Sequence, residues 1–196
     1  MTQQPHDSVP RADSREAGLS TIAARISARS GPDAVGRPGN AADCGDFGIR
    51  ILRDGTWLYH GSPITRKPLV KLFSTVLRRE SDGYWLVTPV ERGRILVDDA
   101  PFTAVEMTIE GSGRAQRVSF RTNLDDTVTA DAAHPLRVAL APATGEPSPY
   151  IEVRNGLEAL IVRSVYYELV ERGEPRIVDG EESYGIWSAG TFFRLG

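Results

Sequence analysis

Two arginines lie where the sequence predicts helices, and both are candidates for binding an anion. Arg66 lies seven residues before Phe73, at the amino-terminal end of a predicted helix and on its apolar face. Unpaired N–H groups and the helix dipole already favour anions at such an end. Arg163 lies in an apolar stretch of a second predicted helix, where its charge needs an acidic partner or an anionic ligand.

Each arginine also has a purely structural interpretation. Arg66 can extend its stem along the edge of the core with its head in water. Arg163 can form an internal salt bridge with Asp or Glu, the usual state of a buried arginine. Of the 23 basic residues only Lys67 and Lys71 are lysines, and coding bias from a GC-rich genome explains that imbalance without any anion. Four neighbouring polar residues could set the specificity of an anion site: His60, Thr88, Glu91 and Tyr167.

Enzyme motifs fit this sequence poorly. The three histidines show no metal-ligand spacing among themselves or with Cys44, which also has no identifiable base and is expected to be a buried small hydrophobe. Gly111-Ser-Gly113 is typical of a hairpin turn. Asp98 and Asp99 alternate across a strand and are expected at the surface or beside arginines. We therefore expect no catalytic residue, no metal and no cofactor, with an enzyme using Cys44 or His60 as the least favoured alternative.

The fold class expected from the pattern is α+β, in three parts. Residues 1–45 form a flexible tail, a short amphipathic helix over 16–28 and a linker. Residues 46–110 form a first half and residues 111–196 a second half. Short strands joined by Gly and Asp turns predict antiparallel sheets, with hairpins at Asp54-Gly55 and at Ala189-Gly190.

A near-repeat predicts that the two halves are copies of one unit. Residues 57–79 align without gaps on residues 150–172, and the alignment keeps apolar type and helical phase. It predicts one helix from Thr65, its N-cap, to about Arg79, with Pro68 in the first turn. It predicts another helix opening at Asn155-Gly156, with Glu158 in capping-box spacing, and running to about Glu171.

The two predicted helices differ outside their shared apolar stripe. The first has a basic face of Lys67, Lys71 and Arg78, which we expect to be solvated. The second is apolar most of the way round, since Leu160, Ile161 and Tyr167 flank its stripe. We therefore expect the second helix at the centre of the molecule, packed against both copies, with Arg163 beside it.

Composition restricts location and partners. A net charge of -3 does not favour non-specific nucleic-acid binding. No apolar run approaches the roughly 20 residues of a spanning helix, and no secretory signal begins the chain. We expect a cytoplasmic protein without membrane insertion, and the sequence predicts no oligomeric state.

Several short motifs, in order, resemble the uncharacterised bacterial family DUF1285. They are Cys44-Gly-Asp46, Asp54-Gly-Thr-Trp57, Gly61-Ser-Pro-Ile64, Asp82-Gly-Tyr84, Leu86 to Glu91, Val97 to Phe102 and His134-Pro-Leu-Arg137. The resemblance implies a duplicated α+β core whose C-terminal half is similar to a pleckstrin-homology fold. It also implies a site between the halves for a nucleotide-like or nucleic-acid-derived ligand, and a role in signal transduction.

These observations lead to one hypothesis and one alternative. The hypothesis is a non-enzymatic binding protein that holds an anionic, nucleotide-like ligand between the halves with Arg66 and Arg163. The alternative is a structural or protein-interaction module in which the surface between the halves is closed core.

Overall fold

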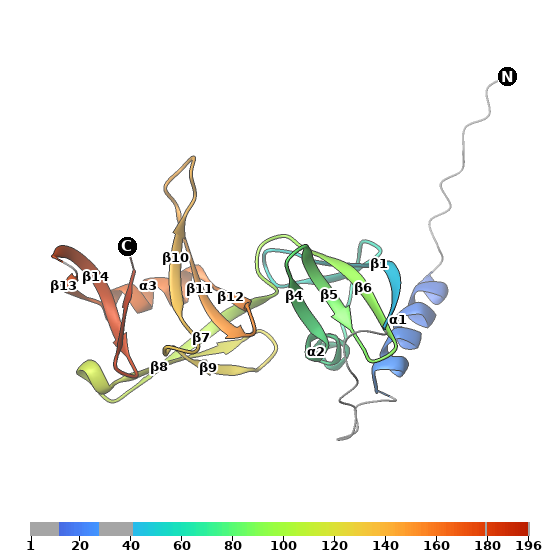
Figure 1. Ribbon diagram of the computed structural model, residues 1–196, viewed down its shortest axis with the longest axis horizontal. Coiled ribbons are helices and arrows are strands. Elements are labelled where there is room, and N and C mark those ends of the chain that lie inside the picture. The colour runs from blue at the N-terminus through green and yellow to red at the C-terminus, as the bar shows by residue number, and fades with distance from the viewer. Residues whose placement is uncertain (1–11, 28–40, 179, 196) are drawn as a thin grey trace.

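Two six-stranded sheets form the body of the protein, and a computed structural model describes residues 12–27, 41–178 and 180–195 (Figure 1). The first sheet has the order β3-β2-β1-β6-β5-β4. Its strands are β1 (Ala42–Ile51), β2 (Trp57–Tyr59), β3 (Ser62–Pro63), β4 (Leu77–Glu80), β5 (Gly83–Val87) and β6 (Glu91–Val97). Helix α1 (Ala12–Ser27) precedes this sheet, and α2 (Lys67–Thr75) connects its two edge strands.

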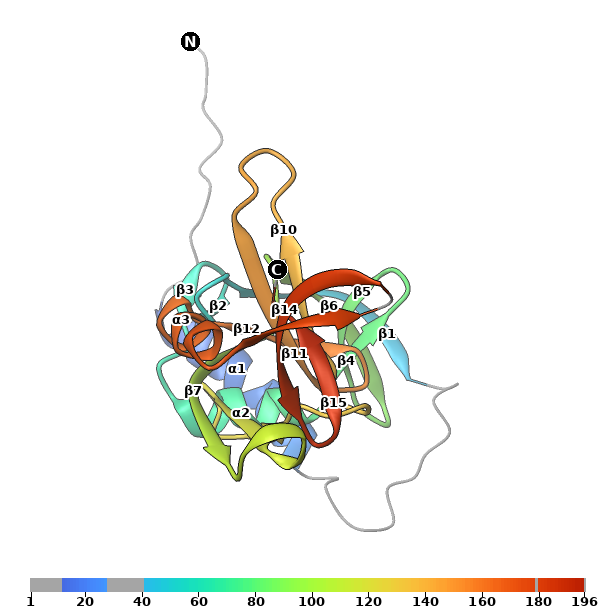
Figure 2. The same ribbon diagram turned by 90° about the vertical axis from the view of Figure 1, so that its left-hand side faces the viewer.

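The second sheet has the order β10-β11-β12-β7-β8-β9. Its strands are β7 (Phe102–Glu110), β8 (Arg117–Thr122), β9 (Thr127–Thr129), β10 (Leu136–Leu140), β11 (Pro147–Arg154) and β12 (Leu157–Ile161), with the 3-10 helix η1 (Gly113–Ala115) between β7 and β8. A short connection joins the edge strands β9 and β10, which requires this sheet to curl. Both views show the hairpin of β10 and β11 extending away from the body (Figures 1 and 2).

The sheets are mixed, not purely antiparallel as predicted. In each sheet the first and last strands in chain order are parallel neighbours at the centre, β1 beside β6 and β7 beside β12. A three-stranded antiparallel meander lies on either side of that parallel pair. Because β7 belongs to the second sheet, the sheets divide earlier than the boundary predicted after residue 110.

The Asn155-Gly156 dipeptide forms a hairpin turn and does not begin a helix. Both residues have positive φ, 48° and 73°, the combination that two-residue hairpin turns require. Residues 157–161 then alternate between buried and partly buried side chains as strand β12. The second helix is therefore shorter than predicted, α3 (Arg163–Glu171).

Helix α2 is shorter than predicted at both ends. Its N-cap is Arg66 instead of Thr65, while Pro68 does lie in the first turn as expected. The helix ends at Thr75 because Leu77 to Glu80 pair as a strand with β5, with Leu77 opposite Leu86. Leu77 and Leu86 are fully buried, so their burial in the sheet outweighs the helical preference of this segment.

The aligned near-repeat segments occupy different places in the two sheets. The strand before the helix is the edge strand β3 in the first segment and the central strand β12 in the second. Both sheets nevertheless have the same strand order about a central parallel pair. Duplication of one unit therefore stays a prediction, and the alignment that suggested it does not superpose equivalent strands.

A third sheet closes the C-terminal end and consists of β13 (Glu174–Val178), β14 (Glu181–Ser188) and β15 (Thr191–Arg194). The predicted hairpin at Ala189-Gly190 is confirmed between β14 and β15, whereas the sequence did not predict β13. The hydroxyl of Ser188 attaches this sheet to the second sheet, because it donates to the carbonyl of Ala130 at 2.6 Å and accepts from the amide of Val118 at 2.9 Å.

One hydrophobic core runs through both halves. Trp57 stacks on Phe73 in the first half, with ring centroids 6.5 Å apart, and the same cluster of buried residues includes Phe102 and Phe120 of the second. The predicted apolar face of α1 is confirmed, since Ile26 is buried and Leu19, Ile22 and Ala23 pack against the cluster. The predicted N-terminal tail and the segment after α1 lie mostly outside the described residues.

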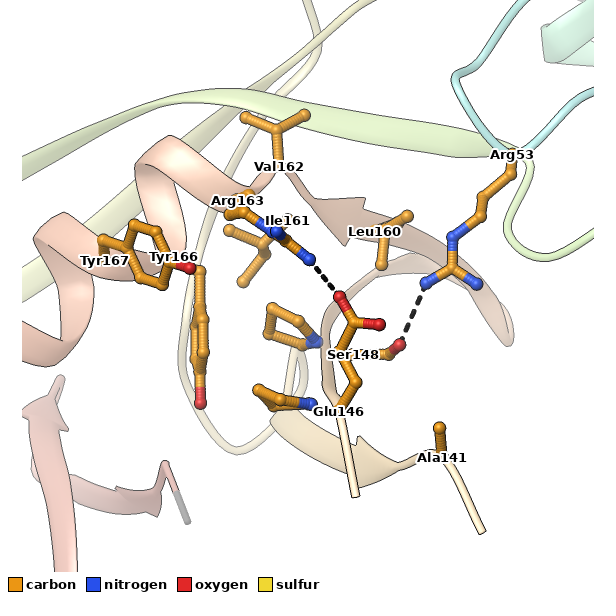
Figure 3. Close-up of a pocket in the computed structure, with 12 residues that line it drawn as sticks. Arg53, Ala141, Glu146, Ser148, Leu160, Ile161, Val162, Arg163, Tyr166 and Tyr167 are labelled. Carbon is orange, nitrogen blue, oxygen red and sulfur yellow. Dashed lines mark hydrogen bonds and ion pairs between the residues drawn. The ribbon is translucent and has the colours of Figure 1, made fainter. Parts of the chain in front are cut away.

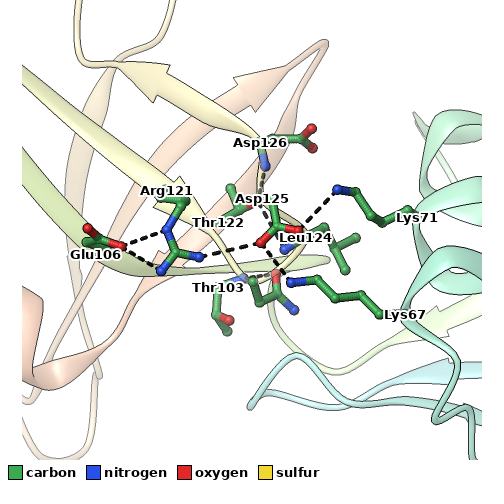
Figure 4. Close-up of polar contacts among 10 residues, drawn as sticks. Lys67, Lys71, Thr103, Glu106, Arg121, Thr122, Leu124, Asp125 and Asp126 are labelled. Atoms are coloured by element: carbon green, nitrogen blue, oxygen red, sulfur yellow. Dashed lines mark hydrogen bonds and ion pairs between the residues drawn. The ribbon is translucent and has the colours of Figure 1, made fainter.

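The turn between β8 and β9 joins the second half to α2 of the first (Figure 4). Asp125 accepts hydrogen bonds from Lys67 Nζ at 2.7 Å and Lys71 Nζ at 3.1 Å. The lysine side chains of this basic face are 49% and 45% exposed, as the prediction of a solvated face requires, and both also bind this carboxylate. The spacing of four residues places them on one side of the helix, where a single acceptor can reach both.

Three further contacts hold the same interface. Arg154 of the second half donates to the carbonyl of Ser74 in α2 at 2.9 Å and pairs with Asp126 at 3.1 Å. Asn123 donates to the carbonyl of Gly55, 3.3 Å away. Leu124, between them, is 4% exposed and points toward α2 in Figure 4. Polar and apolar contacts together therefore fix one half against the other.

We expect Asp125→Asn to reduce the acid sensitivity of the fold. Hydrogen bonds from Lys67 and Lys71 lower the pKa of Asp125. A lowered native pKa gives stability above the unfolded value, about pH 4, that is lost as pH falls through the native value. Urea unfolding between about pH 6 and pH 2 should therefore show a smaller loss of stability in Asp125→Asn than in the wild type.

Glu181→Gln is the matched control, because Glu181 is exposed and has no ion pair among the described residues. Its pH profile should follow the wild type. If Asp125→Asn and the wild type lost stability in parallel over this range, the lysine contacts would contribute nothing to folding.

Candidate functional site

Two of the six residues predicted for an anion site, Arg163 and Tyr167, line one pocket (Figure 3). The pocket has a volume of about 400 Å³ and lies between the β10–β11 connection, the end of β12 and the first turns of α3. Its remaining lining residues are Arg53, Ala141, Glu146, Pro147, Ser148, Pro149, Leu160, Ile161, Val162 and Tyr166. The pocket therefore combines an apolar wall with charged groups at its rim.

Arg53 brings the first half to this pocket. It follows β1, and its Nη2 donates to the hydroxyl of Ser148 at 3.0 Å. Its other terminal nitrogen lies 3.2 Å from a carboxylate oxygen of Asp99. The Arg53 side chain is 62% exposed, so its charge remains open to the pocket and to solvent.

Arg163 is paired internally, as the structural interpretation of the sequence proposed. Its Nη2 donates to a carboxylate oxygen of Glu146 on the β10–β11 connection. The arginine side chain is 69% exposed and the glutamate 56%. The prediction of an apolar environment for Arg163 was wrong, because Leu160 and Ile161 belong to β12 and not to a helical turn around it.

The two tyrosines of α3 have different environments. Tyr166 is 7% exposed, its hydroxyl donates to the carbonyl of Leu195 at 2.6 Å, and burial raises the pKa of its phenol. Tyr167 is 56% exposed. Helix α3 therefore buries one side and leaves the other in solvent, which corrects the prediction that it lies at the centre of the molecule.

The other four predicted residues lie away from the pocket. Arg66 is exposed at the start of α2, with no cap hydrogen bond from its side chain. His60 is in the β2–β3 turn with φ 45°, and its ring meets that of Tyr59 edge-on at 4.4 Å. Thr88 lies in the β5–β6 turn and Glu91 begins β6, and the threonine hydroxyl donates to the backbone carbonyl of Glu91 at 2.9 Å.

The remaining candidates from the sequence have mixed outcomes. Asp98 and Asp99 do pair with arginines, Arg50 at 2.7 Å and Arg53 at 3.2 Å. Cys44 is exposed, not buried as predicted, and its Sγ lies 3.7 Å from a carboxylate oxygen of Glu91. Within residues 12–27, 41–178 and 180–195, no group of three or more His, Cys, Asp or Glu side chains could hold a metal ion.

Sequence reasoning missed Arg53 and Glu146. Arg53 precedes the Asp54-Gly55 turn, so the sequence indicated its position at one end of the first sheet. The sequence did not indicate its neighbour in the second half, Ser148. Glu146 follows Gly145 in a stretch with no periodicity. Both are brought to the pocket by pairing of distant strands, which no local pattern encodes.

Comparisons with known proteins identify the family. The model of the DUF1285 N-terminal domain matches residues 39–100, and that of the DUF1285 C-terminal domain, a protein of unknown function, matches residues 101–195. The chain belongs to the DUF1285 family. A crystal structure of a DUF1285 family protein from Silicibacter pomeroyi DSS-3 is 46% identical, with a TM-score of 0.74 over 87% of this chain and 93% of that one.

A second DUF1285 family protein, from Shewanella baltica OS155, is 26% identical, with a TM-score of 0.50 over 63% of this chain and 91% of its own. No curated protein matches the sequence. The described helices of this DUF1285 protein are all too short or too polar to cross a membrane. The family is thus shown.

Tyr166→Phe should lower the free energy of unfolding by about 1 kcal/mol, and by up to about 3 if the carbonyl of Leu195 is left without a partner. Denaturant unfolding measures the change. Tyr167→Phe, on the exposed side of α3, should have almost no effect. Equal effects of the two substitutions would show that the hydrogen bond to Leu195 does not hold α3 to the third sheet.

Proposed function

We propose that this DUF1285 protein is a non-enzymatic, cytoplasmic protein that binds an anionic, nucleotide-like ligand in the pocket beside Arg163. One observation carries the proposal: Arg53 from the first half and Arg163 from the second line the same pocket with exposed guanidinium groups. Ligand sites favour interfaces between parts of a protein and often have volumes of about 300–1,000 Å³, which includes this pocket.

The ion pair of Arg163 with Glu146 can be exchanged at low cost. Both side chains are more than half exposed, and exposed ion pairs contribute only about 0–1 kcal/mol. A phosphate offers an arginine bidentate, charge-assisted hydrogen bonds in place of that carboxylate. Glu146 would then move aside with the β10–β11 connection, and Arg53 would supply the second cation.

The apolar wall supports a ligand with a planar ring. Pro147, Pro149 and Leu160 provide apolar surface, while Tyr167 presents an exposed ring at the rim. Aromatic rings stack on bases with little sequence preference. An anionic group joined to a base would match both the arginines and this wall, which is why a nucleotide is the class we favour.

The proposal includes the finer features implied by the family resemblance. These are duplication of one unit, a pleckstrin-homology-like second half and a role in signal transduction. The equal strand orders of the two sheets support the first, and a curled sheet followed by α3 supports the second. Binding of a small nucleotide by a protein without catalytic groups would suit a sensor.

Protein interaction is the second candidate function. Leu140 is 62% exposed at the end of β10, on the hairpin that projects from the body in Figure 2. A projecting hairpin with an exposed leucine is a surface that a partner could cover. This alternative predicts no stabilisation by any nucleotide.

Thermal unfolding with a panel of nucleotides tests the proposal. A ligand at 100 times its dissociation constant should stabilise the protein by about 2.7 kcal/mol. Arg163→Gln should abolish the shift. Glu146→Gln should increase it, because the competing carboxylate loses its charge.

Arg172→Gln is the control, since Arg172 is an exposed arginine at the other end of α3, and its shift should equal that of the wild type. If no nucleotide stabilised the wild type, or if Arg163→Gln kept the full shift, the pocket would not be a nucleotide site.

A further inference from the structure

Two arginines stack on the ring of Trp187, which is 7% exposed in the third sheet, and this group is separate from the pocket. The guanidinium carbon of Arg176 lies 4.4 Å from the centroid of the Trp187 ring, and that of Arg114 lies 4.6 Å from it. Phe192 meets the same tryptophan edge-on at 5.4 Å. None of these residues lines the pocket beside Arg163.

Strand register places these side chains together. Trp187 of β14 pairs with Phe192 of β15, so the two rings lie on one face. Arg176 of β13 pairs with Ser183 of β14. Ser183 lies two positions before Gly185, so Arg176 is on the same face as Gly185 and Trp187. A Cβ on Gly185 would clash with the backbone carbonyl oxygen of Phe193 and would lie 2.7 Å from the ring of Phe192, so glycine is needed there for the close approach of β15.

Arg114 reaches the tryptophan because η1 is attached to the β14–β15 turn. The amides of Ala189 and Gly190 donate to the carbonyls of Gln116 and Arg114, at 2.8 and 3.0 Å. The Gln116 side-chain amide donates to the carbonyl of Trp187 at 2.8 Å. The two arginines therefore come from separate elements that are both fixed beside one ring.

The charges of Arg114 and Arg176 are not neutralised by the protein. Among the described residues neither has a carboxylate within ion-pair distance, in contrast to Arg50, Arg92 and Arg137, which are paired. Glu174 accepts the indole N–H of Trp187 at 3.0 Å. Stacking on the ring occupies the flat face of a guanidinium and leaves the N–H donors along its edge available.

We propose that Arg114 and Arg176 form a second anion site, which binds a phosphate group. The guanidinium carbons of Arg176 and Arg114 lie 4.4 and 4.6 Å from one ring centroid, and in the proposed site one phosphate at the edge of the ring accepts a hydrogen bond from each. Bidentate arginine–phosphate hydrogen bonds are strong and directional. The ring orders both side chains in advance, which reduces the entropy lost on binding.

The phosphate can belong to a free ion, a nucleotide or a phosphorylated residue, and each of these presents the same phosphate oxygens to the two arginines. The test uses inorganic phosphate, a nucleoside monophosphate and phosphoserine as separate probes. Each is titrated into ¹⁵N-labelled protein at constant ionic strength, and the indole N–H signals are followed. Trp57, Trp85 and Trp187 give three signals, which single Trp→Phe variants assign.

We expect phosphate to shift the Trp187 signal saturably and to leave those of Trp57 and Trp85 in place. Arg114→Gln and Arg176→Gln should each weaken binding about tenfold, the effect of losing a charge-assisted hydrogen bond. Arg117→Gln, an exposed neighbour without an aromatic contact, should show the same shift of the Trp187 signal as the wild type. Inorganic phosphate should also shift the Trp187 signal of Arg163→Gln as it does that of the wild type. Stronger binding of one organic probe than of inorganic phosphate would identify the source and support the site.

Three results would overturn the proposal. The first is a Trp187 signal that chloride shifts as much as phosphate does. The second is unchanged affinity in both Arg114→Gln and Arg176→Gln. The third is loss of the shift in Arg163→Gln, which would place the phosphate in the pocket instead. Because Arg114 is exposed and Arg176 only partly buried, single substitutions there should leave the core intact, and the other two indole signals check the folding of each variant.

Discussion

The contact between the β8–β9 turn and α2 determines how the two halves sit against each other. Asp125 adopts a left-handed backbone conformation, φ 65°, which an aspartate tolerates better than most residues. The Thr122 hydroxyl accepts from the amides of Leu124 and Asp126, at 3.3 and 3.1 Å, and so holds the turn in shape. That shape presents the carboxylate of Asp125 to both lysines of the chain while Leu124 is buried.

The individual ion pairs at this contact are exposed and weak. Their side chains are 43–49% exposed, where solvent screens the Coulomb attraction. The burial of Leu124 adds an apolar contact between the halves. Arg154 adds a hydrogen bond to the carbonyl of Ser74 and is itself paired with Asp126. The main consequence of these contacts is the orientation of the two halves, because the pocket beside Arg163 needs Arg53 of the first half at its rim.

The sequence was most informative where a short pattern determines local geometry. Asp54-Gly55 and Ala189-Gly190 give the expected hairpins, and the period of α1 gives its buried face. Asn155-Gly156 has the same turn chemistry, but its capping-box spacing to Glu158 led to the prediction of a helix. The segment forms a strand instead, because β12 pairs with the central strand β7. The sequence did not indicate that Lys67 and Lys71 bind Asp125, because Asp125 is more than fifty residues away.

In the candidate site, too, the sequence indicated what local patterns determine and missed what depends on contacts between distant segments. Arg163 and Tyr167 were identified because they lie on α3, whereas Arg66 was chosen from the helix N-terminus and lies elsewhere. Arg53 and Glu146 depend on strand order, which the sequence did not indicate. Arg114 and Arg176 depend on the third sheet, of which β13 was not predicted.

The central claim is that the two halves form one fixed unit, and a distance measurement between them tests it most directly. Spin labels at Ser81→Cys in the first half and Ser164→Cys on α3, in a Cys44→Ser background, should give one narrow distance distribution. Leu124→Ala combined with Asp125→Asn should broaden it. A broad or multiple distribution in the parent protein, or an unchanged width in that variant, would contradict the account.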